Sequence, residues 1–290
     1  MSDNSNIEIP KNWKNRLASL KELPTLCIIG YDFQAEFNMP HFTGTICGEW
    51  SKPESALNPF ASETSYHAVM NWIGWRKKII CQFEHPELIP KLAQQQSLMQ
   101  LRELQQLLGF DIVDQTPSGF LAANQLSDIH EVYGNVKRSK CHSCGKRSES
   151  WQYDASTKKI LICKDCGGWI FPDISMFGWN EQHDAKSRLE MRLSEVENLL
   201  CIGVDFNLHP FVEFKTTIQQ KNLVEIKPKN IVFDYGEQVI SINDIAKTLG
   251  YREADFNALE KTPSTLAEGL SFFYWLNIAL SGGDLGRLMK

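Results

Sequence analysis

The residues best suited to chemistry are two pairs of cysteines, each with two residues between its members. The pairs are Cys141/Cys144 and Cys163/Cys166, and eighteen residues lie between them. A C-x2-C turn points two thiolates at one place, so two such turns can complete a tetrahedral shell around a metal ion. Four protein ligands leave no position for water. The spacing therefore predicts a structural zinc site and disfavours a catalytic one.

Two other chemistries share the C-x2-C spacing. Disulfides are disfavoured in a reducing cytoplasm, and a redox-active pair would not be expected twice. Gly145 and Gly167-Gly168 follow the two pairs and supply the positive φ that such turns need, which favours zinc. His142, inside the first pair, is expected to be a solvated turn residue. The single cysteines stand beside apolar neighbours and are expected to be small buried hydrophobes: Cys27, Cys47, Cys81 and Cys201.

Histidines and serines do not define a second catalytic centre. Four histidines lack metal-ligand spacing to a carboxylate or to each other: His67, His85, His130 and His209. The serines lack a Gly-x-Ser-x-Gly frame, so a hydrolase triad has no support. Trp72 and Trp75 have the spacing of a helix face and are expected to pack in the core, with a ligand platform as the alternative. His41, beside Pro40, remains a candidate for testing.

The elements that must position these residues are short apolar strands alternating with helices. Helices are predicted over 11–22, 65–80, 86–108 and 184–198, and strands over 25–29, 110–113, 199–202, 223–226 and 231–233. This alternation predicts an α/β fold with a mostly parallel, Rossmann-like sheet and helices on both faces. Ligands of such sheets bind at the carboxyl ends of the strands. The loops that begin at Gly30, Asp114 and Gly203 are therefore expected to determine function.

Composition and charge limit the possible functions. The 290 residues are 42% hydrophobic and 22% charged, which is ordinary globular usage, and the net charge is −5. A mildly acidic chain without a basic block is a poor candidate for nucleic-acid binding. No apolar signal segment is visible at the start, and the longest apolar stretch, 269–281, is too short to span a bilayer. We therefore expect a cytoplasmic protein that binds neither nucleic acid nor membrane.

Several segments together resemble the sirtuins, the NAD-dependent protein deacylases. IHEVYGNVKRSKCHSCG is similar to the stretch from the family's catalytic histidine into its first zinc knuckle, and CKDCGGWIFPDISMFGW to the second knuckle and the Pro-Asp-Ile-x-x-Phe-Gly after it. Weaker matches are IIGYDFQAEFNMPHFTG, IVDQTPSGFL, CIGVDFNLHP and LVEIK. The resemblance implies a Rossmann domain over 25–250, with a helical insertion at about 44–108 and a zinc ribbon at about 136–180. A helical lead-in, 1–24, and a helical extension, 251–290, flank this domain.

The resemblance also implies catalytic positions, and this chain departs from most of them. Tyr133 stands where the family has its catalytic histidine, and an ordinary tyrosine is only about 0.1% ionised at pH 7. Service as a base would need a pKa shift of roughly three units. Gln115 and Gly119 keep the family's residues. The other replacements are Thr116 for Asn, Ser118 for Asp, Thr43 for Arg and Lys227 for the ribose-contacting Asn.

The phosphate-binding loops implied by the resemblance carry new carboxylates. The first keeps Gly30 but has Asp32 in place of its second glycine, and the third keeps Gly203 but has Val204-Asp205 where Thr-Ser is usual. Asp114 opens the second loop in place of Thr. At about 6 Å and an effective dielectric of about 20, one carboxylate–phosphate pair costs roughly 3 kcal/mol, or about two decades in affinity. Alternatively, any of these acids could turn outward or cap a helix.

The segment after residue 250 ends in a strongly apolar helix, predicted over 264–281. Thr265 and Glu268 form a capping box, and the following GLSFFYWLNIALS is apolar on nearly every face. It either packs on the sheet domain as a core helix or contacts a partner or a second copy, since Phe272, Tyr274 and Trp275 are typical anchor residues.

The leading interpretation is a sirtuin-like pseudoenzyme: a scaffold or interaction subunit that keeps structural zinc and has lost NAD binding and deacylase activity. One alternative is an active NAD-dependent deacylase, ADP-ribosyl transferase or NAD glycohydrolase that uses Tyr133 or His130 as base. Another is a binding module whose acidic crevice, with Asp32, Asp114 and Asp205, holds a cation, an amine or a ribose diol.

Overall fold

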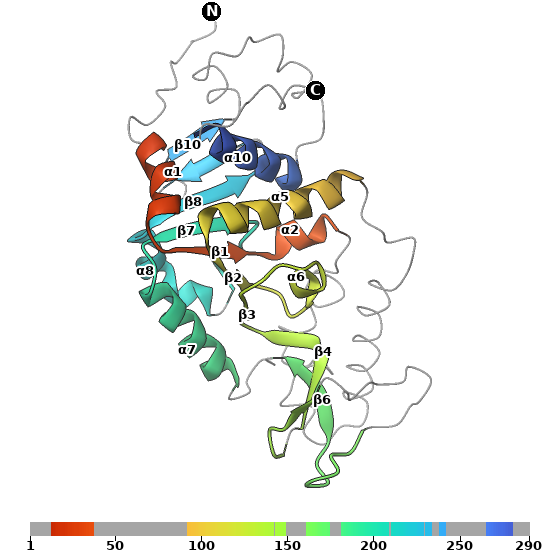
Figure 1. The fold of residues 1–290 in the computed structure, drawn as a ribbon. Coiled ribbons are helices and arrows are strands. Elements are labelled where there is room, and N and C mark those ends of the chain that lie inside the picture. The colour runs from red at the N-terminus through yellow and green to blue at the C-terminus, as the bar shows by residue number, and fades with distance from the viewer. Residues whose placement is uncertain are drawn as a thin grey trace, which may run out of the picture. The chain divides into compact units, whose positions relative to one another are not determined.

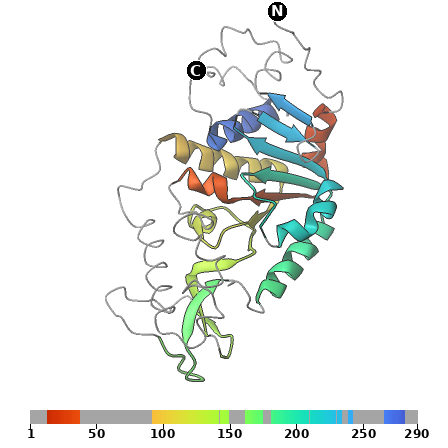
Figure 2. The ribbon, with the colours of Figure 1, turned by 180° about the vertical axis from the view of Figure 1, so that it is seen from behind.

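The computed structural model describes residues 13–37, 92–141, 143–148, 161–174, 181–208, 210–228, 230–233, 238–241 and 265–280. The predicted helix over 65–80 lies outside these residues. So do several residues singled out above: His41, Thr43, Cys47, His67, Trp72, Trp75, Cys81, His85, His142 and His209. The described chain divides into two compact units (Figures 1 and 2). Unit 1 takes the described residues within 1–36, 91–112 and 192–290, and unit 2 takes those within 37–90 and 113–191.

Unit 1 is built on parallel strands with helices packed on them. Its strands are β1 (Thr25–Ile29), the first half of β2 (Asp111–Asp114), β7 (Asn198–Ile202), β8 (Asn222–Lys227), β9 (Asn230–Phe233) and β10 (Gln238–Ser241). Its helices are α1 (Trp13–Glu22), α2 (Tyr31–Ala35), α5 (Leu92–Leu108), η2 (Phe211–Phe214), α8 (Lys215–Gln219) and α10 (Leu266–Leu280), together with the end of α7 (Glu181–Ser194).

The strand order of the sheet is β10-β9-β8-β7-β1-β2-β3, where β3 is Ile129–Glu131 and β2 is the strand at which the chain passes into unit 2. β7 pairs in parallel with both β1 and β8. All five residues of β1 and all five of β7 are buried. Such continuous apolar strands are typical of parallel sheets covered on both faces, so the predicted α/β Rossmann-like fold is confirmed.

One edge of the sheet is antiparallel, which the sequence did not predict. β9 pairs antiparallel with β8, and β10 pairs antiparallel with β9. Only two residues, Pro228 and Lys229, lie between β8 and β9. A parallel connection needs a crossover of a dozen or more residues, so a link this short requires a hairpin.

A buried polar cluster fixes α1 at the amino ends of the central strands. The Asn198 amide, fully buried, donates to the Ser19 carbonyl oxygen at 2.8 Å and to the Thr25 hydroxyl at 3.1 Å. The Asn222 amide donates to the Asn198 side-chain oxygen at 2.8 Å and to the Ser19 hydroxyl at 2.7 Å. Because buried polar groups are costly unless paired, this cluster holds the starts of β1, β7 and β8 in register with α1.

The C-terminal helix α10 is part of the core of unit 1. It packs against α5, β8, β9 and α2, and Figures 1 and 2 show it beside α5. Leu266, Leu270, Phe273 and Leu276 are buried. This is the core-helix arrangement, and the buried face is therefore not available to a partner.

Unit 2 contains the rest of β2, α6 (Phe120–Ala123), β3 and most of α7. It also holds a three-stranded antiparallel sheet in the order β5-β4-β6, made from β4 (Gly134–Cys141), β5 (Arg147–Ser148) and β6 (Ile170–Ile174).

In both units, the predicted elements that fall on described residues are present with shifts at their ends. The largest shift is in α7, which ends at Ser194 because β7 starts at Asn198. No helix among the described residues is long and apolar enough to cross a membrane.

The contact between the chain segments after β1 and β7 leaves no room for a side chain at Gly30. A Cβ on Gly30 would overlap the Gly203 carbonyl oxygen and the Val204 Cα, both backbone atoms that cannot rotate away. We expect Gly30→Ala to lower the free energy of unfolding by about 3 kcal/mol, measured by urea denaturation. The control is Gly109→Ala, where φ is +68° but nothing lies within 4 Å of a new Cβ. It should cost only about 1 kcal/mol. Equal, small losses in both variants would contradict the close approach.

Candidate functional site

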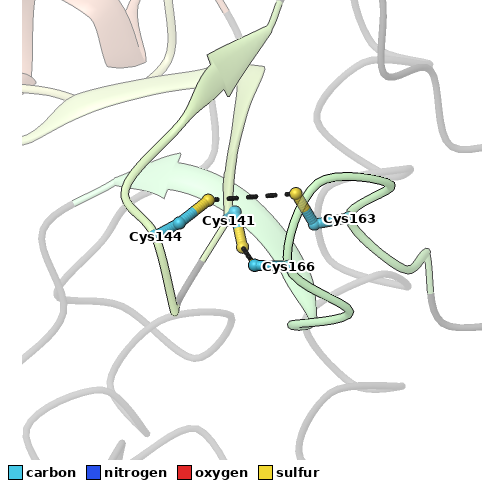
Figure 3. A group of neighbouring side chains, drawn as sticks. All are labelled: Cys141, Cys144, Cys163 and Cys166. Carbon is cyan, nitrogen blue, oxygen red and sulfur yellow. Dashed lines mark hydrogen bonds between the residues drawn. The ribbon is translucent and has the colours of Figure 1, made fainter.

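The two cysteine pairs come together in unit 2 as one cluster. The four sulfur atoms lie within 4.8 Å of one another, and Figure 3 shows them converging from two turns. The Sγ atoms of Cys141 and Cys166 are 3.4 Å apart, and those of Cys144 and Cys163 are 3.9 Å apart. Four sulfurs tetrahedrally placed at about 2.3 Å from zinc would be about 3.8 Å from each other. The observed cluster therefore fits a four-thiolate zinc site.

Both turns have the same backbone geometry. The Gly145 N–H donates to the Cys141 carbonyl oxygen at 3.0 Å, and the Gly167 N–H donates to the Cys163 carbonyl oxygen at 2.9 Å. In each turn, the N–H of the first cysteine donates to the carbonyl five residues on, at 2.8 Å. Gly145 and Gly167 have φ of +71° and +74°, as the sequence predicted, because closing this turn needs a left-handed residue after the second cysteine. Gly168, for which positive φ was also expected, does not have it, because only one left-handed residue is needed.

Hydrogen bonds in the cluster move the pKa values of the Cys141 and Cys166 thiols in opposite directions. Burial raises the pKa of the Cys141 thiol, but hydrogen bonds from the Cys144 and Ser143 backbone and from neighbouring thiols outweigh it and lower the pKa to about 7. At Cys166, the Gly168 N–H favours the thiolate. The neighbouring thiols and desolvation oppose that effect and raise the pKa to about 12. Without a metal, the four thiols therefore do not all ionise at neutral pH. Zn2+ would hold them as thiolates and close the ribbon, with no ligand position left for substrate.

Buried side chains flank the cluster and connect it to the sheet of unit 2. Cys141, Cys163 and Ile170 form a small core, with Leu161 packed on it. On the surface, the Lys146 ammonium pairs with Asp165 and joins the two turns. Cys27 and Cys201 are not part of the cluster. Both side chains are fully buried, and burial raises the pKa of each thiol, so both thiols stay protonated. Their assignment as small hydrophobes is confirmed.

The second candidate site consists of the loops that follow β1 and β7 in unit 1. The Gly30 N–H donates to the Ile202 carbonyl oxygen at 2.8 Å, and the Asp32 N–H donates to the Gly203 carbonyl oxygen at 3.2 Å. These bonds continue the parallel ladder beyond both strands. The loops that begin at Gly30 and Gly203 therefore meet at the carboxyl edge of the sheet, where the sequence placed both of them but did not predict their contact.

Carboxylates and one ammonium gather at this edge. Asp32 is exposed in the first turn of α2. Desolvation raises the pKa of the Asp32 carboxyl, the Lys227 ammonium opposes the rise, and the Asp205 carboxylate adds to it. Lys227 in turn forms an ion pair with Glu225, a buried acid within β8. Asp205 also accepts a hydrogen bond from the Asn207 N–H at 2.9 Å, which holds its side chain over its own turn.

Asp114 lies in unit 2, and its carboxylate stabilises the turn that follows β2. It is fully buried, and one of its carboxylate oxygens accepts hydrogen bonds from the Thr116 N–H at 2.8 Å and the Thr116 hydroxyl at 3.0 Å. The Thr116 and Ser118 hydroxyls are 2.8 Å apart, and Ser118 accepts from the Phe120 N–H at the start of α6 at 3.0 Å. The polar side chains of this loop thus bond to one another. Asp114 therefore neither lies open as a crevice acid nor turns outward or caps a helix, because its carboxylate closes its own buried turn.

Tyr133 lies in the turn between β3 and β4, beside the Asp114 loop. The neighbouring Val132 N–H donates to the Asp114 carbonyl oxygen at 3.4 Å. A Cβ on Gly119 would meet the Asn135 side-chain oxygen at 2.6 Å, so loop and strand pack closely. Glu131 pairs with Arg138 and accepts from the Asn135 amide, which stiffens this turn. Unit 2 therefore brings together Tyr133 and the loop of Gln115, which is itself buried.

Three residues of unit 1 matter here and were not singled out from the sequence. Glu225 interrupts the apolar run LVEIK, and a lone acid in a buried strand was a usable signal. Glu36 and Leu266 contact residues far away in the chain, and no local pattern indicates such contacts.

Comparison with known proteins identifies the family. The model of the Sir2 family matches residues 65–210, just over half of the chain, so the chain belongs to the Sir2 family. An NAD-dependent protein deacylase of Leptospira interrogans is 24% identical over 211 residues, which are 71% of this chain and 82% of that protein. An NAD-dependent protein deacetylase of Fusobacterium nucleatum is 26% identical over 117 residues, and this match spans only 40% of this chain and 42% of that protein.

Solved structures have the same fold. A sirtuin studied for the basis of substrate affinity matches with a TM-score of 0.56 at 21% identity, over 73% of this chain and 86% of that one. A Sir2 homologue in complex with NAD gives 0.55 at 18% identity, over 74% and 82%. A Sir2 histidine-to-tyrosine mutant with a p53 peptide and NAD gives 0.52 at 22% identity, over 73% and 84%.

The zinc site predicts a metal content that depends on pH. We expect one zinc ion per chain by elemental analysis, none in Cys163→Ser, and an unchanged content in the matched control Cys27→Ala. Zinc must displace protons from thiols such as Cys166, whose pKa is raised to about 12. The zinc affinity should therefore fall by more than about tenfold for each unit of acidification. A cluster that keeps a pH-independent affinity, or a purified protein without zinc, would contradict the assignment.

The carboxylate at the edge of the sheet predicts a pH-dependent stability difference. Folding raises the pKa of Asp32, so the ionised carboxylate weakens folding at neutral pH, and this penalty disappears as the pH falls through the pKa. Asp32→Asn should therefore raise the melting temperature slightly near pH 7 and lose this advantage in acid. Glu190→Gln, at an exposed position of α7, is the matched control and should change little at either pH. A destabilised Asp32→Asn near pH 7 would mean that the Lys227 contact dominates instead.

Proposed function

We propose that this chain is a Sir2-family pseudoenzyme: a zinc-stabilised scaffold or interaction subunit that neither binds NAD productively nor removes acyl groups. The observation that carries the proposal is the pair of carboxylates, Asp32 and Asp205, on the two loops that meet after β1 and β7. By the family resemblance, these loops correspond to the loops that bind pyrophosphate in sirtuins. In this chain the corresponding edge carries negative charge.

Electrostatics at this edge oppose a dinucleotide. Asp205 raises the pKa of Asp32, so the two carboxylates already repel each other in the folded chain. A diphosphate would add two negative charges, and each carboxylate–phosphate pair at about 6 Å costs roughly 3 kcal/mol at an effective dielectric of about 20. Lys227 lowers the pKa of Asp32 more than Asp205 raises it, but the same ammonium is paired with Glu225, so one cation faces three carboxylates at this edge. We infer that the residues present do not fit NAD.

Backbone groups that could receive a phosphate are also engaged. The Asp32 N–H donates to the Gly203 carbonyl oxygen, and the Asn207 N–H donates to the Asp205 carboxylate. A ligand anion would have to replace the Asp205 carboxylate at Asn207 while lying beside its negative charge. Bringing a further negative charge next to a carboxylate in a partly desolvated place is unfavourable.

The proposed loss of deacylase activity has a second cause, which is Tyr133 at the position of the family's catalytic histidine. A phenol with an ordinary pKa near 10 is protonated at neutral pH and is a poor general base. A Sir2 histidine-to-tyrosine mutant has been solved with both a p53 peptide and NAD. A tyrosine in place of that protein's histidine is thus compatible with bound NAD. We therefore assign the proposed loss of NAD binding in this chain to the loop carboxylates rather than to Tyr133.

The intact four-cysteine cluster supports the scaffold part of the proposal. Metal binding in such ribbons is coupled to folding, so the ribbon retains its value as structure when catalysis is lost. The partner, a protein or a second copy of this chain, would bind a surface other than the buried face of α10.

Two other functions are alternatives to the pseudoenzyme. An active deacylase, ADP-ribosyl transferase or NAD glycohydrolase would need Tyr133 or His130 as base, and the family's activity favours it. A binding module for a cation or amine at Asp32 and Asp205 is favoured by their mutual repulsion, although Lys227 already supplies positive charge there. In that case Asp32→Ala should weaken binding of the cation.

The direct test of turnover is nicotinamide release from NAD in the presence of acetylated peptide. Zinc-loaded wild-type protein is expected to release no more nicotinamide than the protein-free reaction. The NAD-dependent protein deacetylase of Fusobacterium nucleatum serves as the positive control. The matched variant is Tyr133→Phe, which removes only the hydroxyl. Nicotinamide release by the wild type that disappears in Tyr133→Phe would contradict the proposal and identify the phenol as the working base.

A further inference from the structure

The first turn of α10 is held by a carboxylate from a distant part of unit 1. Glu36, directly after α2, accepts hydrogen bonds from the N–H groups of Leu266 and Ala267, the latter at 2.9 Å. The first N–H groups of a helix have no partner within it, and an anion there also interacts favourably with the helix dipole. Glu36 thus caps α10 from another element, across about 230 residues of sequence.

The same turn packs on the loop that follows β7. A Cβ on Gly203 would lie 2.9 Å from the Cδ1 atom of Leu266 and 3.2 Å from the Cβ atom of Asp32. Leu266 itself is only 4% exposed. The loop after β1, the loop after β7 and the first turn of α10 therefore meet at one point, Gly203.

One turn further along, α10 also contacts the end of β8. A Cβ on Gly269 would overlap the Lys227 carbonyl oxygen and would lie 3.0 Å from the Cγ2 atom of Ile226. Glycine at this position allows the helix to approach the strand closely. At its middle, α10 is attached to α5 through the Gln100 amide, which donates to the Ser271 hydroxyl at 3.0 Å, and through the hydroxyl of Tyr274, which donates to Glu103.

We propose that the first turn of α10 is a latch on the carboxyl edge of the sheet in unit 1, and that Glu36 is the positioning residue that closes it. The latch comprises Glu36, Leu266, Ala267 and their contact at Gly203. While it is closed, it fixes the loops after β1 and β7 in the arrangement that places Asp32 beside Asp205. Lifting this turn releases both loops together and leaves the central strands folded.

The physical reason for the coupling is that Glu36 belongs to the same short segment as Asp32. α2 has five residues, and Glu36 is its C-terminal capping residue. A helix this short depends on tertiary contacts for its stability. Loss of the Glu36 hydrogen bonds therefore destabilises the whole of α2, including the Asp32 N–H bond to the Gly203 carbonyl oxygen. It also frees Leu266, whose side chain packs against Gly203.

Hydrogen–deuterium exchange of the full-length, zinc-loaded protein tests the latch. In Glu36→Ala, amides in 30–36, 203–208 and 266–271 should exchange at least about tenfold faster, while those of β1, β7 and β8 keep their protection. Glu36→Gln keeps one acceptor oxygen without charge and should give an intermediate acceleration in the same three segments. The matched control is Tyr274→Phe, which removes a bond between α10 and α5 and should leave 30–36 and 203–208 unchanged.

Two outcomes would overturn the latch. Acceleration confined to 266–271 would make Glu36 a simple helix cap with no hold on the loops. A uniform acceleration that includes β1, β7 and β8 would mean that Glu36 contributes only to global stability. If Glu36→Ala does not fold, the pattern in Glu36→Gln decides between the same outcomes. The experiment uses no nucleotide, so its result is independent of the proposed loss of NAD binding.

Discussion

The backbone contact between the chain after β1 and the chain after β7 determines how the edge of unit 1 is built. The parallel register pairs Ile29 with Ile202, and the hydrogen bonds at Gly30 and Asp32 extend this pairing past both strands. Only glycine fits at position 30 because the Gly203 carbonyl occupies the space of its side chain. With the two loops fixed in this way, Asp32 and Asp205 are brought within electrostatic range of each other, whatever the cost of the repulsion. The chemistry of this edge therefore follows from strand register.

The zinc ribbon depends on a different constraint. Its two turns repeat one backbone pattern, so that four sulfur atoms converge without help from the elements of unit 1. Folding of the ribbon is tied to metal binding, and folding of the Rossmann sheet to burial of apolar strands. Because these requirements are separate, substitutions in the loops of the sheet leave the ribbon intact. A Sir2-family chain can in this way keep its architecture while other positions change, as the family resemblance implies for Tyr133, Thr116 and Ser118.

Local patterns in the sequence predicted most of the fold. The C-x2-C spacing predicted the four cysteines that cluster, and the apolar runs predicted β1, β7 and β8 to within a residue at each end. Features that depend on contacts between distant residues were not predictable. The antiparallel edge could have been inferred from the two-residue link before β9, but the Ser19–Asn198–Asn222 cluster and the Glu36 contact have no local signature. Asp114 shows a further limit: its sequence position suggested a crevice acid, and its hydrogen bonds are those of a turn.

The central claim is that the acidic edge of the sheet has lost its affinity for the family's dinucleotide. Isothermal titration calorimetry of ADP-ribose into the zinc-loaded protein tests it without depending on catalysis, and Asp32→Gly combined with Asp205→Ser provides the variant with the family's residues restored. The account predicts no saturable heat for the wild type up to about 1 mM ligand, and tighter binding in the double variant. A one-to-one isotherm for the wild type with a Kd in the micromolar range would contradict it.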